Sequence, residues 1–159
     1  MLLWFAGTAV LTITFVFRDP RFDYRLLVAG VLLPPVVDVW SGGAWVMHSL
    51  VASVVLLVVV MLATIGRRPV RRMLLGLPLG TLLHLVFTGA WRDPQVFWWP
   101  FGGLSFGDAP LPIVARGWWN VPLELIGAGM LAWIWRTADL SAPAARRRAV
   151  STGQLDVVH

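Results

Sequence analysis

The 159-residue sequence contains no cysteine and no lysine, and charged residues make up only 13% of it. The absence of cysteine excludes thiolate metal sites, catalytic thiols and a disulfide framework. A soluble domain carries about 25% charged residues. The shortage of charge, with 58% hydrophobic residues and a mean hydropathy of +0.75, therefore excludes a soluble globule and a disordered chain. The composition indicates an integral membrane protein.

Long apolar runs recur five times along the chain. A helix needs about 20 apolar residues to cross the bilayer core, with about 17 as the lower limit. The runs are Leu2–Phe17, Leu26–Trp40, Ala44–Ile65, Met73–Trp91 and Val121–Trp135. They predict an all-α integral membrane protein with about five transmembrane helices. No positively charged segment precedes the first run and no cleavage site follows it, so we interpret it as the first span and not as a signal peptide.

The second run is short and is interrupted by Pro34 and Pro35. Proline has no N–H and disfavours helix at the residue before it. One interpretation is that the chain unwinds from Pro34 to Gly43 and forms the wall of a site, since irregular backbone at membrane depth must be buried or line a cavity. The other is a simple helix end followed by a hairpin at residues 41–43.

Positive charge comes from 13 arginines, which predict the orientation of the spans. Eleven of them fall in three segments on one side of the predicted membrane, near residues 18–25, 67–72 and 136–148, and only Arg92 and Arg116 fall on the other. The positive-inside rule therefore predicts an outer N-terminus and an inner C-terminus. Most tryptophans then lie at the outer interface, where indole rings are favoured. The arginines form no single basic face, so we expect no nucleic-acid partner.

The chain divides into one embedded domain and a tail. Residues 1–137 are predicted to form a single membrane-embedded helical domain, with an outer loop at 92–117 that is rich in proline and glycine. Residues 138–159 are predicted to be a basic, disordered cytoplasmic tail lying against anionic lipid head groups.

Four ionisable side chains fall within or at the ends of the predicted spans: Asp38, His48, His84 and Glu124. Such residues are costly in a membrane and indicate function by default. The predicted topology places all four in the outer half of the bilayer. Mixed histidine and carboxylate ligands suit a divalent metal such as Zn or Mn, and a metal held there would activate water for hydrolysis. We expect Asp38, His48 and His84 to bind the metal and Glu124 to act as the catalytic base.

Each of these residues also has a structural interpretation. Asp38 would cap a turn, His48 would bond a backbone carbonyl, His84 would pair within the helix bundle, and Glu124 would bond nearby backbone or pair with Arg116. These alternatives are open from the residues alone.

Four segments carry a family resemblance. The segment 30–38, the pair His48-Ser49, the segment 80–88 and the Trp-Pro-Phe element within 97–102 resemble the small bacterial membrane-bound metal-dependent hydrolases, a group that includes the LexA-binding, inner-membrane-associated hydrolases. The resemblance covers about residues 26–103. It implies a multipass protein of the bacterial cytoplasmic (inner) membrane, with metal ligands at Asp38, His48 and His84. Pro35 and Thr88 stand where the family has carboxylates.

These features define a hydrolase hypothesis and its competitors. The first is a metal-dependent hydrolase acting on a lipid-borne ester or phosphoester that enters from the outer leaflet. The alternative is a catalytically degenerate membrane scaffold or binding protein without metal, in which Pro35 and Thr88 mark lost ligands. Haem ligation by His48 and His84 is a weaker hypothesis, because nothing else indicates electron transfer. Transport is also weaker, because the five apolar runs contain no repeat.

Overall fold

The structure is a computed structural model, and it describes residues 1–17, 19, 22–41, 43–105 and 116–156. Over these residues the chain is all-helical, as the sequence predicted. The α-helices are α1 (Leu2–Phe17), α2 (Tyr24–Ser41), α3 (Leu50–Ala63), α4 (Arg68–Leu74), α5 (Gly76–Thr88), α6 (Pro94–Phe97), α8 (Asn120–Thr137) and α9 (Pro143–Thr152). Short 3-10 turns, η1 (Val46–His48), η2 (Ala90–Arg92) and η3 (Gly117–Trp119), precede α3, α6 and α8.

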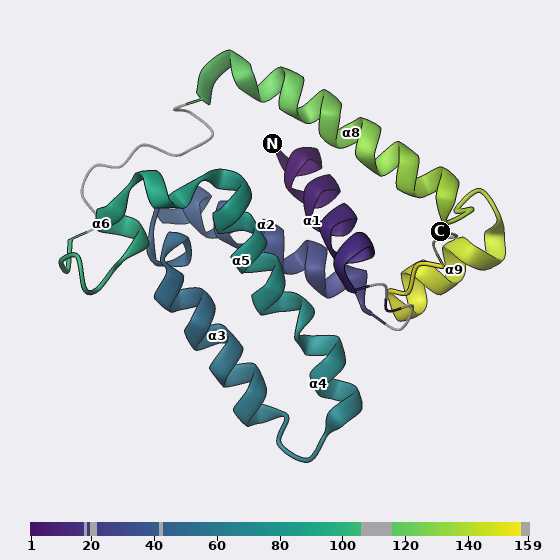
Figure 1. The fold of residues 1–159 in the computed structure, drawn as a ribbon, viewed down its shortest axis with the longest axis horizontal. Coiled ribbons are helices and arrows are strands. Elements are labelled where there is room, and N and C mark those ends of the chain that lie inside the picture. Colours follow the sequence, from purple (N-terminus) through teal and green to yellow (C-terminus); the bar gives the residue numbers. More distant parts are fainter. Residues whose placement is uncertain (18, 20–21, 42, 106–115, 157–159) are drawn as a thin grey trace.

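Helices α2 and α5 form the centre of the bundle, and glycine allows them to approach closely. A Cβ atom at Gly30 would overlap the backbone of Leu77, and one at Gly80 would overlap the backbone of Leu27. Small residues at such contacts are typical of helix packing in membranes. The two helices therefore pack backbone to backbone, and α1 and α3 pack on their sides (Figure 1).

Helix α8 packs along α1, and glycine again allows the two helices to approach closely. A Cβ atom at Gly127 would overlap the backbone of Leu3 and Trp4. Figure 1 shows α8 running beside α1 at the edge of the molecule, and α3 and α4 forming the tip of a hairpin on the opposite side. The core between α1, α2 and α8 contains Phe5, Leu27 and Ile134 among its buried side chains.

Helix α2 differs from the prediction for the second run. It continues to Ser41 with Pro34 and Pro35 inside it, so the interpretation that the chain unwinds from Pro34 is wrong, and the alternative of a simple helix end agrees with the structure. Pro35 cannot donate to the carbonyl of Val31, four residues earlier. That carbonyl instead interacts with the ring of His84 on α5. Helix α2 thus continues through both prolines where it packs against α5.

The C-terminal segment also differs from its prediction. The predicted disorder after residue 138 is wrong for the described part, because residues 143–152 form α9 and the chain after it packs against the start of α2. The N–H of Tyr24 donates to the carbonyl of Gly153 (2.9 Å), and the Arg25 guanidinium donates to the carbonyls of Val150 and Ser151 (2.8 Å each). These contacts are tertiary, so composition alone could not show them.

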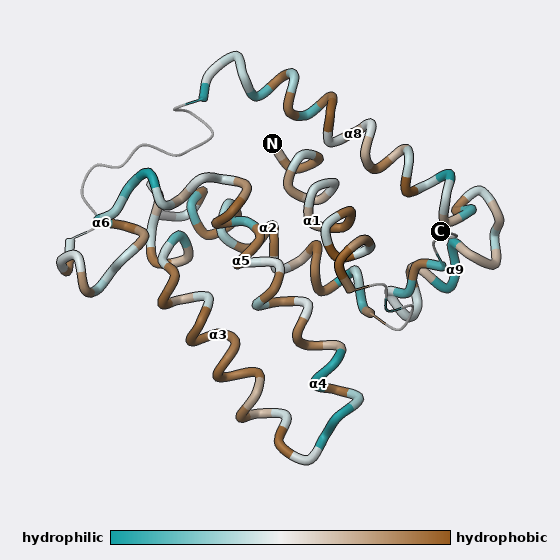
Figure 2. Tube along the Cα trace, in the orientation of Figure 1, coloured by the Kyte–Doolittle hydropathy of each residue, from teal (hydrophilic) through white to brown (hydrophobic). Residues whose placement is uncertain are grey.

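One helical stretch among the described residues, Arg68–Thr88, is long and apolar enough to cross a membrane. Helices α1 and α3 are apolar but shorter. The five predicted spans are therefore not confirmed by helix length. Figure 2 shows hydrophobic residues along most of α3 and hydrophilic residues on α4 and α9.

Candidate functional site: a buried histidine pair

The structure brings together three of the four predicted site residues. His48 lies in the turn before α3, His84 lies one turn before the end of α5, and Asp38 lies one turn before the end of α2. All three are between 2% and 4% exposed. Residues far apart in the sequence thus meet in the interior, at the end of the bundle that also carries α6 (Figure 1).

The start of α3 fixes the position of His48. The hydroxyl of Ser49 accepts from the N–H of Ala52 (3.1 Å) and donates to the carbonyl of Val46 (2.8 Å). A serine in this position is a helix N-cap. The His48-Ser49 pair in the sequence therefore combines a site residue with the cap that ends the turn holding it.

The two imidazole rings face each other through the same atom. His48 Nε2 and His84 Nε2 are 3.3 Å apart, and the ring planes are inclined at 79°. Phe5 lies against His84, with ring centroids 4.3 Å apart. Neither motif nor spacing in the sequence indicated Phe5, because it reaches His84 only when α1 packs on α5.

Asp38 places an acceptor on the other side of the His48 ring. Asp38 Oδ1 lies 3.3 Å from His48 Nδ1, and the Val31 carbonyl interacts with the His84 ring. A carboxylate in this place favours the tautomer that carries its proton on Nδ1. His48 Nε2 then presents a lone pair to His84 Nε2. An Nε2–H of His84 can donate to that lone pair, and a cation bound by both Nε2 atoms is the other arrangement that satisfies the pair.

The spacing of the pair fits two ligands of one metal. Two nitrogen ligands about 2.0–2.1 Å from a tetrahedral ion are about 3.3–3.4 Å apart. The hydroxyl of Thr88, one turn beyond His84, is buried and has no hydrogen-bond partner among the described residues. However, no group of three or more histidine or acidic side chains within the described residues is placed to hold a metal. His48 and His84 therefore fit two ligand positions of one metal ion.

Asp38 occupies a different position from the one expected for a direct ligand. It contacts Nδ1 of His48, on the side of the ring away from His84. From there it orients the ring and makes Nε2 a better donor to a cation.

Glu124 makes its hydrogen bonds and its ion pair with the start of α1 and not with His48 or His84. Its side chain pairs with the N-terminal ammonium of Met1 and accepts from the N–H groups of Leu3 (2.8 Å) and Trp4 (3.2 Å). Those N–H groups belong to the first turn of α1, which has no helical partners for them. The structure therefore makes Glu124 a cap of α1 supplied by α8. The alternative pairing with Arg116 is not found in the described structure, where Arg116 donates to the carbonyls of Phe87 and Thr88.

Comparison with family models, curated proteins and solved structures found no match to this chain. The class that the fold and site define is therefore an all-helical protein with a buried Asp–His–His cluster.

Proposed function

We propose that the chain is a multipass protein of the bacterial inner membrane in which His48 and His84 bind a divalent metal such as Zn or Mn, in the manner of the membrane-bound metal-dependent hydrolases it resembles. The observation that carries the proposal is the 3.3 Å approach of the two Nε2 atoms, with the Asp38 carboxylate on the far side of the His48 ring. A metal supplies Lewis acidity and activates water. The proposed substrate is a lipid-borne ester or phosphoester.

The distribution of side chains supports a membrane location. Val16, Val39 and Leu62 are between 63% and 79% exposed, whereas Thr8, Ser53 and Thr81 are at most 4% exposed. Soluble monomers rarely expose extended apolar surface, and lipid would cover these side chains. The close glycine contacts between helices agree with this location.

The arrangement of the helix ends supports the proposed topology. In Figure 1 the end of α1, the start of α2 and the end of α8 lie toward the right and the start of α4 lies toward the bottom, whereas α8 and α1 begin, and α2 ends, farther to the upper left. The arginine-rich segments belong to the first set, which the positive-inside rule assigns to the cytoplasm. We therefore propose an outer N-terminus and an inner C-terminus.

Metal content tests the proposal directly. Elemental analysis of detergent-purified protein is expected to give about one Zn or Mn per chain in the wild type, and background in His48→Ala and His84→Ala. Thr81→Val is the matched control, because Thr81 is buried on the same helix and its hydroxyl donates only to the carbonyl of Pro78. It should keep the metal.

Asp38→Asn separates an orienting role from direct ligation. Loss of a carboxylate behind a histidine ligand typically costs about 10–100-fold in metal affinity. We expect that loss in a metal titration, with full occupancy restored at high metal concentration. A variant that cannot be loaded at any concentration would show that Asp38 is itself a ligand.

A second function, a membrane scaffold or binding protein without metal, is favoured by one observation. His48, His84 and Asp38 are all nearly inaccessible, and the described residues offer no third ligand group. Background metal in the wild type, after growth in medium supplemented with Zn and Mn, would support this function and refute the hydrolase proposal. If metal is present, turnover of lipid esters and phosphoesters is the next measurement.

A further inference from the structure

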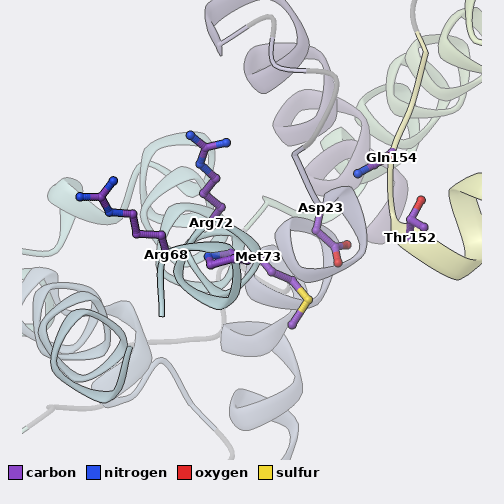
Figure 3. Close-up of a pocket in the computed structure, with 7 residues that line it drawn as sticks. Asp23, Arg68, Arg72, Met73, Thr152 and Gln154 are labelled. Carbon is purple, nitrogen blue, oxygen red and sulfur yellow. The ribbon is translucent and has the colours of Figure 1, made fainter. Parts of the chain in front are cut away.

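A cavity of about 440 Å³ lies between α4 and the end of α9, at the arginine-rich end of the bundle. Small-molecule sites in proteins have volumes of about 300–1,000 Å³. Its lining residues are Asp23, Arg68, Pro69, Arg72, Met73, Thr152 and Gln154. Figure 3 shows the two arginines on one side of the space, with their guanidinium groups directed away from Asp23, Thr152 and Gln154 on the other side.

Arg68 and Arg72 bring positive charge to one wall of this cavity. They are four residues apart on α4, so they lie on the same side of the helix. Both are exposed, and no acidic side chain in the described part of the chain forms an ion pair with either of them. A guanidinium offers a planar set of donors that matches a phosphate group.

Asp23, the acidic side chain in the lining, is already neutralised. Arg25 Nη2 lies 2.8 Å from Asp23 Oδ2, and Arg25 Nε and N–H donate to Oδ1. Burial by itself raises the pKa of the Asp23 carboxyl, but the hydrogen bonds and charge of Arg25 outweigh it and lower the pKa. Asp23 therefore stays ionised and paired, and the charge of Arg68 and Arg72 is left for a ligand.

The opposite wall depends on the fold of the tail. Gly153 adopts a left-handed conformation (φ 73°), and a Cβ atom there would overlap the Asp23 carboxylate. Glycine thus lets the chain turn tightly against α2 and place Thr152 and Gln154 beside the cavity. The Gln154 amide adds two N–H donors.

We propose that this cavity binds the phosphate group of an anionic phospholipid at the cytoplasmic surface of the membrane. The inference rests on the proposed membrane location and not on the proposed hydrolase activity. A lipid is favoured over a soluble phosphate because apolar side chains form part of the lining: Pro69 and Met73 line the cavity, and Met73 is 41% exposed. Clustered arginines at a membrane surface attract anionic lipids.

The test is an isothermal calorimetric titration of detergent-purified full-length protein with dioctanoyl phosphatidylglycerol and with dioctanoyl phosphatidylcholine. We expect saturable binding of the anionic lipid, weakened at least tenfold in Arg68→Gln/Arg72→Gln. The matched control is Arg146→Gln/Arg147→Gln, which removes the same charge from exposed positions on α9 outside the cavity. It should change the affinity less than twofold.

Three results would overturn the proposal. Equal weakening by both double variants would show non-specific attraction, and equal affinity for phosphatidylcholine would show that the head-group charge is not recognised. Binding of glycerol 3-phosphate as tightly as the lipid would show a soluble ligand. Arg68→Lys/Arg72→Lys keeps the charge and is the control for misfolding of the glutamine variant. It should retain most of the affinity. Metal content measured on the same samples should not change, so failure here is distinct from failure of the metal site.

Discussion

At the scale of single residues, the decisive feature is which atom of each side chain meets which partner. The sequence identified Asp38, His48 and His84 as candidates from their chemistry in apolar surroundings, and the structure brings them together. It also separates their positions, since the histidines face each other through Nε2 while Asp38 stands behind one ring. Residue type and spacing could not distinguish a ligand from the carboxylate that orients it.

Glu124 provides a prediction at this scale. Glu124→Gln removes the charge that attracts the first-turn N–H groups of α1, and hydrogen bonds to charged groups contribute about 1.5–3 kcal/mol. We expect thermal unfolding in detergent to show a stability loss of about 1–2 kcal/mol, with metal content unchanged. Loss of lipid-ester turnover without any loss of stability would instead identify Glu124 as the catalytic base.

At the scale of helices, local propensity and tertiary packing disagree in two places. Pro34 and Pro35 suggested a break as one of two interpretations, but α2 continues through both where it packs against α5. The arginine-rich tail predicted disorder, but α9 forms and its last carbonyls accept from Arg25. A cation at a helix C-terminus is favourable, and here it comes from another helix.

The glycine contact between α2 and α5 predicts a strong effect of one added methyl group. Gly80→Ala places a Cβ atom against the backbone of Leu27 and Val31, and overpacking costs about 1–3 kcal/mol. We expect that loss of stability, together with weaker metal binding, because His84 lies one turn away on the same helix.

Gly129→Ala is the matched control for this contact. Gly129 lies within α8, and an added Cβ atom would meet nothing within 4 Å. Alanine is favoured over glycine in a helix by about 0.5–1 kcal/mol, so this variant should be as stable as the wild type or slightly more so. Similar destabilisation by both substitutions, measured by thermal unfolding, would contradict the close packing of α2 and α5.

At the scale of the whole molecule, the proposed topology predicts which segments face each side of the membrane. Because the native chain has no cysteine, single cysteines report accessibility without background. A membrane-impermeant maleimide should label Ser105→Cys in spheroplasts, and should label Ser141→Cys and Ile65→Cys only after lysis. The unsubstituted protein is the control and should remain unlabelled. Labelling of all three positions in spheroplasts, or the reverse pattern, would refute an outer N-terminus and an inner C-terminus.

The sequence by itself determined the all-helical architecture and the identity of the candidate site residues. Both follow from local properties of the sequence. The architecture follows from the length of apolar runs such as Leu2–Phe17, which has the same bounds as α1. The candidate residues follow from the rarity of ionisable groups within these runs. Only the tertiary structure decided that α2 continues through Pro35, that Glu124 caps α1, and that the tail closes a cavity with Arg68 and Arg72. Each of these depends on a partner more than 25 residues away in the chain, and no local pattern encodes which distant group will satisfy a free carbonyl, N–H or charge.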